Sequence, residues 1–232
     1  MLSQSTYILV LGVAVEVCFL VCSISRGALL RYFFLNLYVI LSIFADLIRQ
    51  YVLHYYGFTS PDYVYVYYYS DLLLTLSLII AVISLASRVF EELHFARLIR
   101  WVAVLLLLGT AGFSYAVIAQ SSQRLYTTFA FELSQNLYFV GLVITYILWG
   151  AVLKLRETRT RLVQMVLALG LYFSGYAGTY ALVNLGSKHE VLLVQYLGPI
   201  LGCFLPVSWM LTILRYNEDS RLAPARLAAV PR

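Results

Sequence analysis

The stretch SPDYVYVYYYSDLLLTLSLIIAVISLAS, residues 60–87, decides the fold class of this chain. Its first half alternates Tyr and Val as a β-strand would, whereas its second half is a long apolar run without charge. Ser60 suits a helix N-cap, Pro61 the first helical position and Asp62 the positive end of a helix dipole. Because an isolated strand edge cannot satisfy its backbone in lipid, the sequence predicts a transmembrane helix over residues 63–87.

The composition of the whole chain extends this assignment. Hydrophobic residues make up 62% and charged residues 12% of the 232 positions, against roughly 45–50% and 25% in an average soluble domain. A bilayer core needs about 20 apolar residues per helix. Seven windows meet this criterion, at 7–25, 29–55, 63–87, 98–119, 128–153, 163–186 and 191–214. The predicted fold is an all-α integral membrane protein, a seven-transmembrane-helix bundle over residues 1–214 that leaves no room for a soluble domain.

The basic residues predict the orientation of this bundle. Lys and Arg accumulate on the cytoplasmic side of membrane proteins. One side of the predicted bundle carries Arg26, Arg31, Arg88, Arg97, Arg100, Lys154, Arg156, Arg159, Arg161, Arg215, Arg221, Arg226 and Arg232, and the other side carries Arg49, Arg124 and Lys188. The bias predicts an N-terminus outside and a disordered cytoplasmic tail over residues 215–232. The net charge of +5 then faces anionic lipids of the bilayer, and no nucleic-acid partner is expected.

The first residues and the loops bear on targeting. No Lys or Arg precedes Tyr7 and no A-x-A-like cleavage site follows the first window, so we expect a retained helix and not a cleaved signal peptide. No N-x-S/T glycosylation acceptor occurs in the chain. These features favour the bacterial cytoplasmic (inner) membrane as the location.

Polar residues within the predicted spans indicate a functional site, because ionisable groups at membrane depth are costly and usually face a bundle interior. The candidate ligand-binding residues lie in the outer half of their spans and are Asp46, Arg49, Tyr67, Tyr68, Asp71, Glu132, Gln135, Asn184 and Gln195. Glu16, near the middle of the first span, is a candidate buried acid or proton site. The inner half is nearly all apolar, so the sequence predicts an outward-facing polar, tyrosine-rich cavity above an apolar plug.

Several of these assignments stay open at the sequence level. The tyrosines of residues 63–69 suit an aromatic belt at the membrane surface as well as a cavity wall. Asp46 and Arg49 stand at i, i+3 and can pair with each other, or Arg49 can bind an anionic ligand group. The carboxylates within the spans are those of Glu16, Asp46, Asp71 and Glu132. They can bind a ligand, bind a cation or serve only to join helices.

The sequence argues against several kinds of chemistry. The only lysines, Lys154 and Lys188, lie in predicted loops, so a retinal Schiff base in the last helix is excluded. His54, His94 and His189 lie in separate regions and no H-E-x-x-H motif occurs, so no metal site is expected. No nucleophile and base pair is recognisable. We therefore expect a protein that is not an enzyme and has no cofactor.

The third window also carries a resemblance to a known group of proteins. Its opening SPDYVYVYYYSD (60–71) and its end SRVFEE (87–92) resemble short seven-helix membrane proteins of bacteria, which look like the N-terminal seven-transmembrane sensor module of some histidine kinases. The likeness covers mainly the second and third predicted helices. It implies a sensing role without an attached output domain, because residues 215–232 are too short to fold as one.

Three functions fit these observations. The leading one is a membrane sensor or ligand-binding module that takes a small molecule from the outer side and signals through a separate membrane or cytoplasmic protein. The second is an accessory or scaffold subunit of a larger membrane complex. The third is a small-solute or proton-coupled transporter that uses Glu16 and the outer carboxylates.

Overall fold

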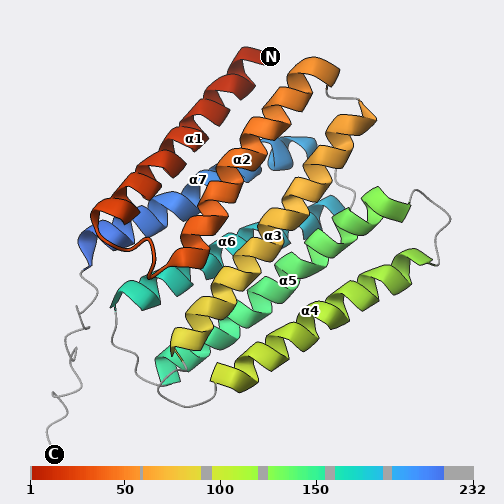
Figure 1. Cartoon of the computed structure of the whole chain (residues 1–232). Coiled ribbons are helices and arrows are strands. Elements are labelled where there is room, and N and C mark those ends of the chain that lie inside the picture. Colours follow the sequence, from red (N-terminus) through yellow and green to blue (C-terminus); the bar gives the residue numbers. More distant parts are fainter. Residues whose placement is uncertain are drawn as a thin grey trace, which may run out of the picture.

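A computed structural model describes residues 2–57, 60–89, 96–119, 125–154, 160–184 and 190–216, which form seven helices (Figure 1). They are α1 Leu2–Ser25, α2 Phe33–Tyr56, α3 Pro61–Val89, α4 Ala96–Ala119, α5 Leu125–Lys154, α6 Thr160–Asn184 and α7 Glu190–Arg215. Each predicted window overlaps one of these helices. Within the described residues, four helical stretches are long and apolar enough to cross a membrane, namely Phe33–Tyr56, Pro61–Arg88, Phe129–Val152 and Thr160–Leu182. They indicate an integral membrane protein built as a helical bundle.

The first turn of the chain shows how local sequence sets a helix boundary. Gly27 has a φ of 62°, its N–H bonds to the carbonyl of Ile24, and the N–H of Ala28 bonds to the carbonyl of Ser23. These two bonds are the Schellman motif, which places a glycine in the left-handed region just beyond a helix end. The turn continues to residue 32, so α2 begins later than the predicted residue 29.

The N-terminus of α3 forms as predicted from its capping residues. The backbone N–H of Tyr63 donates to the Ser60 Oγ at 3.0 Å, and the helix begins at Pro61. Because the segment is helical, tyrosines four residues apart share a face. The rings of Tyr65 and Tyr69 stack with centroids 6.2 Å apart and are exposed, as an aromatic belt requires.

Six helices enclose the core of the bundle. Neighbours pack in the order α1, α2, α3, α5, α6 and α7, and α7 packs back against α1. α3 also touches α6 across this ring, and α4 packs outside it against α3 and α5 (Figure 1). Consecutive helices run in opposite directions. The end of the bundle where α2 ends and α3 begins is therefore opposite the end where α6 begins and α7 ends.

Candidate functional site

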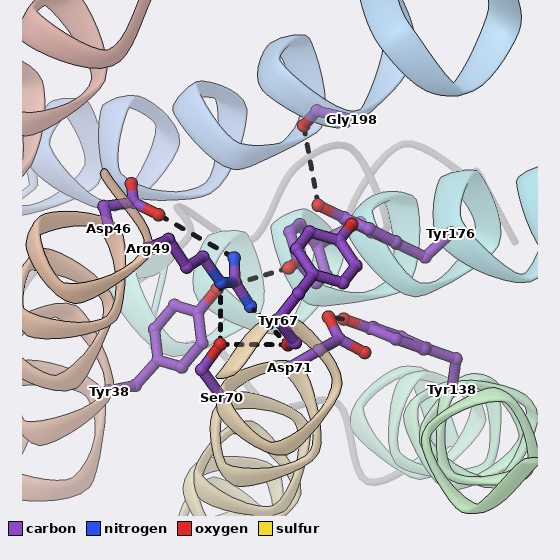
Figure 2. Close-up of polar contacts among 10 residues, drawn as sticks. Tyr38, Asp46, Arg49, Tyr67, Ser70, Asp71, Tyr138, Tyr176 and Gly198 are labelled. Carbon is purple, nitrogen blue, oxygen red and sulfur yellow. Dashed lines mark hydrogen bonds and ion pairs between the residues drawn. The ribbon is translucent and has the colours of Figure 1, made fainter. Parts of the chain in front are cut away.

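Arg49 connects α2 to α3 near the end where these helices meet. Its Nε donates to the Ser70 Oγ at 2.7 Å and its Nη2 to the Tyr67 carbonyl at 3.3 Å (Figure 2). The guanidinium carbon lies 4.7 Å from the Tyr67 ring centroid, a cation–π contact. Its Nη1 lies 3.8 Å from the Asp46 Oδ1, so the i, i+3 pair that the sequence left as one of two alternatives is present in the structure.

Asp71 lies one turn further along α3 and joins three helices. The Tyr138 hydroxyl of α5 donates to its Oδ1 and the Tyr180 hydroxyl of α6 to its Oδ2, both at 3.4 Å (Figure 2 shows Tyr138). Short O–H···O⁻ bonds measure about 2.5–2.7 Å, so both bonds are long and weak. The Arg49 guanidinium and the Ser134 hydroxyl of α5 are further neighbours of Asp71. We refer to Asp46, Arg49, Tyr67, Ser70 and Asp71 as the polar cluster.

A chain of aromatic rings leads from the polar cluster across the bundle. Tyr138 stacks on Tyr176 with centroids 4.8 Å apart and planes at 6°, and the Tyr176 ring lies 4.7 Å from that of Tyr172. The Tyr172 hydroxyl lies 3.2 Å from the Tyr38 hydroxyl of α2. The Tyr176 hydroxyl makes a long 3.5 Å contact with the Gly198 carbonyl of α7 (Figure 2). The rings thus connect α5 and α6 to α2 and α7.

The interior tyrosines are the residues that the sequence analysis missed. Tyr172, Tyr176 and Tyr180 recur every four residues in the stretch YFSGYAGTY, the spacing that puts side chains on one helix face. This periodicity was the available signal. Tyr38 lies only five residues after the start of α2 and is buried, at a level where the sequence predicted an almost wholly apolar plug.

Tyr68 lies at the edge of the polar cluster, where its ring meets that of Tyr67 with centroids 5.6 Å apart. The Tyr68 ring also packs edge-on against Phe131 of α5. Glu132 and Gln135 are half-buried on α5, and the structure gives neither side chain a hydrogen bond or ion pair with the other described residues. The side chains of Asn184 and Gln195 are outside the part that the structure describes. From the predicted set, the structure therefore brings together Asp46, Arg49, Tyr67 and Asp71, with Tyr68 beside Tyr67.

Glu16 occupies a second polar position. Its side chain is 6% exposed and lies beside Ser42 of α2. Its Oε2 is buried and has no hydrogen-bond partner among the described residues. Glu16 is therefore buried within the bundle, as expected from its position near the middle of the first predicted span. Its role as a proton site stays a prediction.

The polar cluster offers groups for an organic ligand. Within the described ranges, no three His, Cys, Asp or Glu side chains gather closely enough to hold a metal ion. The cluster instead presents one guanidinium, two carboxylates, the Tyr67 phenol and the Ser70 hydroxyl, with the phenols of Tyr138 and Tyr180 against Asp71. Comparison of the chain with protein-family models, with curated proteins and with solved structures finds no match in any of the three. The resemblance to sensor modules stays a prediction, and the function is argued from the site.

Proposed function

We propose that this chain is a non-enzymatic membrane sensor or ligand-binding module whose ligand binds at the polar cluster and whose signal passes to a separate protein. The proposal includes seven spans, with the polar cluster near the outer face of a bacterial cytoplasmic membrane and the C-terminus inside. One observation carries it. A guanidinium and a carboxylate lie close together within a membrane bundle, and the carboxylate accepts long hydrogen bonds from two tyrosines.

The partners of Arg49 and Asp71 suggest the chemistry of the ligand. Apart from the 3.8 Å contact with Asp46, Arg49 binds a neutral hydroxyl and a neutral carbonyl, which a ligand carboxylate or phosphate would replace with stronger, charge-assisted bonds. Asp71 accepts hydrogen bonds from the phenols of Tyr138 and Tyr180. An ammonium or hydroxyl group of the ligand would replace these two donors. The Tyr67 and Tyr138 rings supply apolar surface. The ligand class is a small molecule with an anionic group, a donor group and an apolar part.

The aromatic chain supplies a route for the signal. A ligand that takes over the Asp71 oxygens releases the hydroxyls of Tyr138 and Tyr180. Tyr138 is stacked on Tyr176, whose hydroxyl contacts Gly198 on α7. A ligand shifts a conformational equilibrium only by its differential affinity for the two states. Here that difference arises because the ligand binds Asp71 only when the two tyrosines have left it.

The test is native mass spectrometry of protein extracted gently from its own membrane. We expect one small molecule at fixed stoichiometry, lost in Arg49→Gln and in Asp71→Asn. Arg26→Gln is the matched control, because Arg26 is an exposed arginine at the opposite end of the bundle and its loss should leave the ligand bound. Ligand retained by both cluster variants would contradict the proposal. A bound polypeptide in place of a small molecule would support the subunit alternative.

A further inference from the structure

A groove runs between α6 and α7 at the end of the bundle opposite the polar cluster. Its cavity volume is about 260 Å³. Leu167 and Leu171 of α6 and Phe204 of α7 form apolar walls. Gln164 of α6 and Thr212 and Arg215 of α7 also line it. α6 and α7 are neighbours in the ring and pack against each other, so the groove lies along their contact.

The lining of the groove changes from polar to apolar along the helix axes. At 1.5 Å per residue, Gln164 lies about 6 Å from the start of α6, and Arg215 is the last residue of α7. Leu171 and Phe204 both lie about 16 Å from this end of their helices. The polar part is thus at the helix ends and the apolar part is deeper. This is the order of headgroup and acyl chain in a membrane leaflet.

Among the described residues, the charges at the polar end favour an anion. Arg215 is exposed, and no carboxylate pairs with it among the residues that the structure describes. Carbonyls at a helix C-terminus repel anions, but the Arg161 side chain donates to the carbonyls of Ile213 at 3.2 Å and Tyr216 at 2.6 Å. Arg161 thereby offsets the negative end of α7 and fixes the backbone that carries Arg215.

We propose that this groove binds an anionic phospholipid, with the lipid phosphate at Arg215 and an acyl chain along Leu167, Leu171 and Phe204. A lipid is the ligand that reaches such a groove from the bilayer, and each basic side chain near a membrane surface strengthens binding of anionic lipid. The groove shares no residue with the polar cluster, so this proposal does not depend on the sensor function.

The test uses the full chain reconstituted in phosphatidylcholine vesicles that contain a minor fraction of phosphatidylglycerol. Lipid retained after detergent extraction is counted by native mass spectrometry. We expect preferential retention of phosphatidylglycerol and an about fivefold loss in Arg215→Gln, the effect of one basic residue. Arg26→Gln is the matched control, because Arg26 is an exposed arginine just beyond the end of the neighbouring α1. Ser208→Phe should also reduce retention, because Ser208 lines the groove and the larger ring fills it without changing charge.

Three results would overturn the proposal. One is equal retention of the two lipids by the unmodified chain. Another is an equal loss in Arg26→Gln and Arg215→Gln, which would show a general charge effect of the membrane surface. The third is unchanged lipid retention in Ser208→Phe, because a lipid seated in the groove cannot share that space with a phenyl ring.

Discussion

Single hydroxyl groups connect helices that are distant in the sequence. The phenols of Tyr38 and Tyr172 lie 3.2 Å apart although 134 residues separate them, and both side chains are buried. In lipid such a pair has no water to replace a lost partner. Measured interhelical hydrogen bonds in membranes nevertheless average only about 0.6 kcal/mol, with a maximum near 1.7 kcal/mol. The pair therefore contributes more to the position of α2 against α6 than to total stability.

A double-mutant cycle measures this pair. We expect Tyr38→Phe and Tyr172→Phe to show a coupling energy of about 0.6–1.7 kcal/mol, because either change alone already breaks the bond. The measurement is the free energy of unfolding in mixed micelles. Tyr38→Phe combined with Tyr69→Phe is the control, because Tyr69 is exposed on α3 and its effect should add. Additive effects in the Tyr38 and Tyr172 pair would contradict the hydrogen bond.

Among the elements, the contact between α5 and α6 depends on a missing side chain. A Cβ added at Gly141 of α5 would overlap the ring of Phe173 on α6, and Phe173 is fully buried. The glycine lets the two backbones approach closely, as small residues do in membrane bundles. Because Phe173 contacts the rings of Tyr138 and Tyr172, the same contact holds the aromatic chain in register.

Two glycines of one helix provide a matched pair of variants. Gly141→Ala should lower the free energy of unfolding by about 1–3 kcal/mol, the usual effect of overpacking a core. Gly150→Ala should leave it unchanged or raise it by about 0.5–1 kcal/mol, because a Cβ there meets open space and alanine favours the helix. Both are measured by thermal unfolding in the same detergent. Equal effects of the two substitutions would contradict the close α5–α6 approach.

At the scale of the whole molecule, the alternation of helices gathers arginines at one end. Arg26, Arg88, Arg161 and Arg215 lie at the end where α6 begins and α7 ends, whereas Arg49 lies towards the other end. Lys and Arg mark the cytoplasmic side, so the proposed orientation puts the groove inside and the polar cluster outside. The proposed ligand site and the proposed lipid site would then lie on opposite faces, which suits the proposed role in transmitting a signal across a membrane.

Cysteine labelling of intact cells tests this orientation. In a chain whose native Cys18, Cys22 and Cys203 are replaced by Ser, Tyr56→Cys should react with a membrane-impermeant maleimide. Arg26→Cys should react only after permeabilisation. Both parent residues are exposed and lie at opposite ends of the bundle. The reverse pattern would contradict the N-outside orientation, and labelling of both in intact cells would contradict a membrane-spanning α2.

Two kinds of signal made the helices and part of the polar cluster predictable. Apolar windows identify helices because each span must fill the bilayer core and satisfy its own backbone, and the cap at Ser60 needs only local residues. Asp46 and Arg49 could be paired in advance because both lie on one helix, three residues apart. The partners of Asp71 could not be predicted in the same way, because Tyr138 and Tyr180 lie 67 and 109 residues away in the sequence.

The sequence by itself therefore determined which segments are helical, that the protein belongs in a membrane, and which residues within one helix meet. Only the tertiary structure decided that α4 lies outside a ring of six helices, that Tyr138, Tyr176 and Tyr180 face inward, and that Asp71 meets two of them. The physical reason is that hydropathy sets the position of a helix in the bilayer, whereas its rotation about its own axis is set by packing against neighbours.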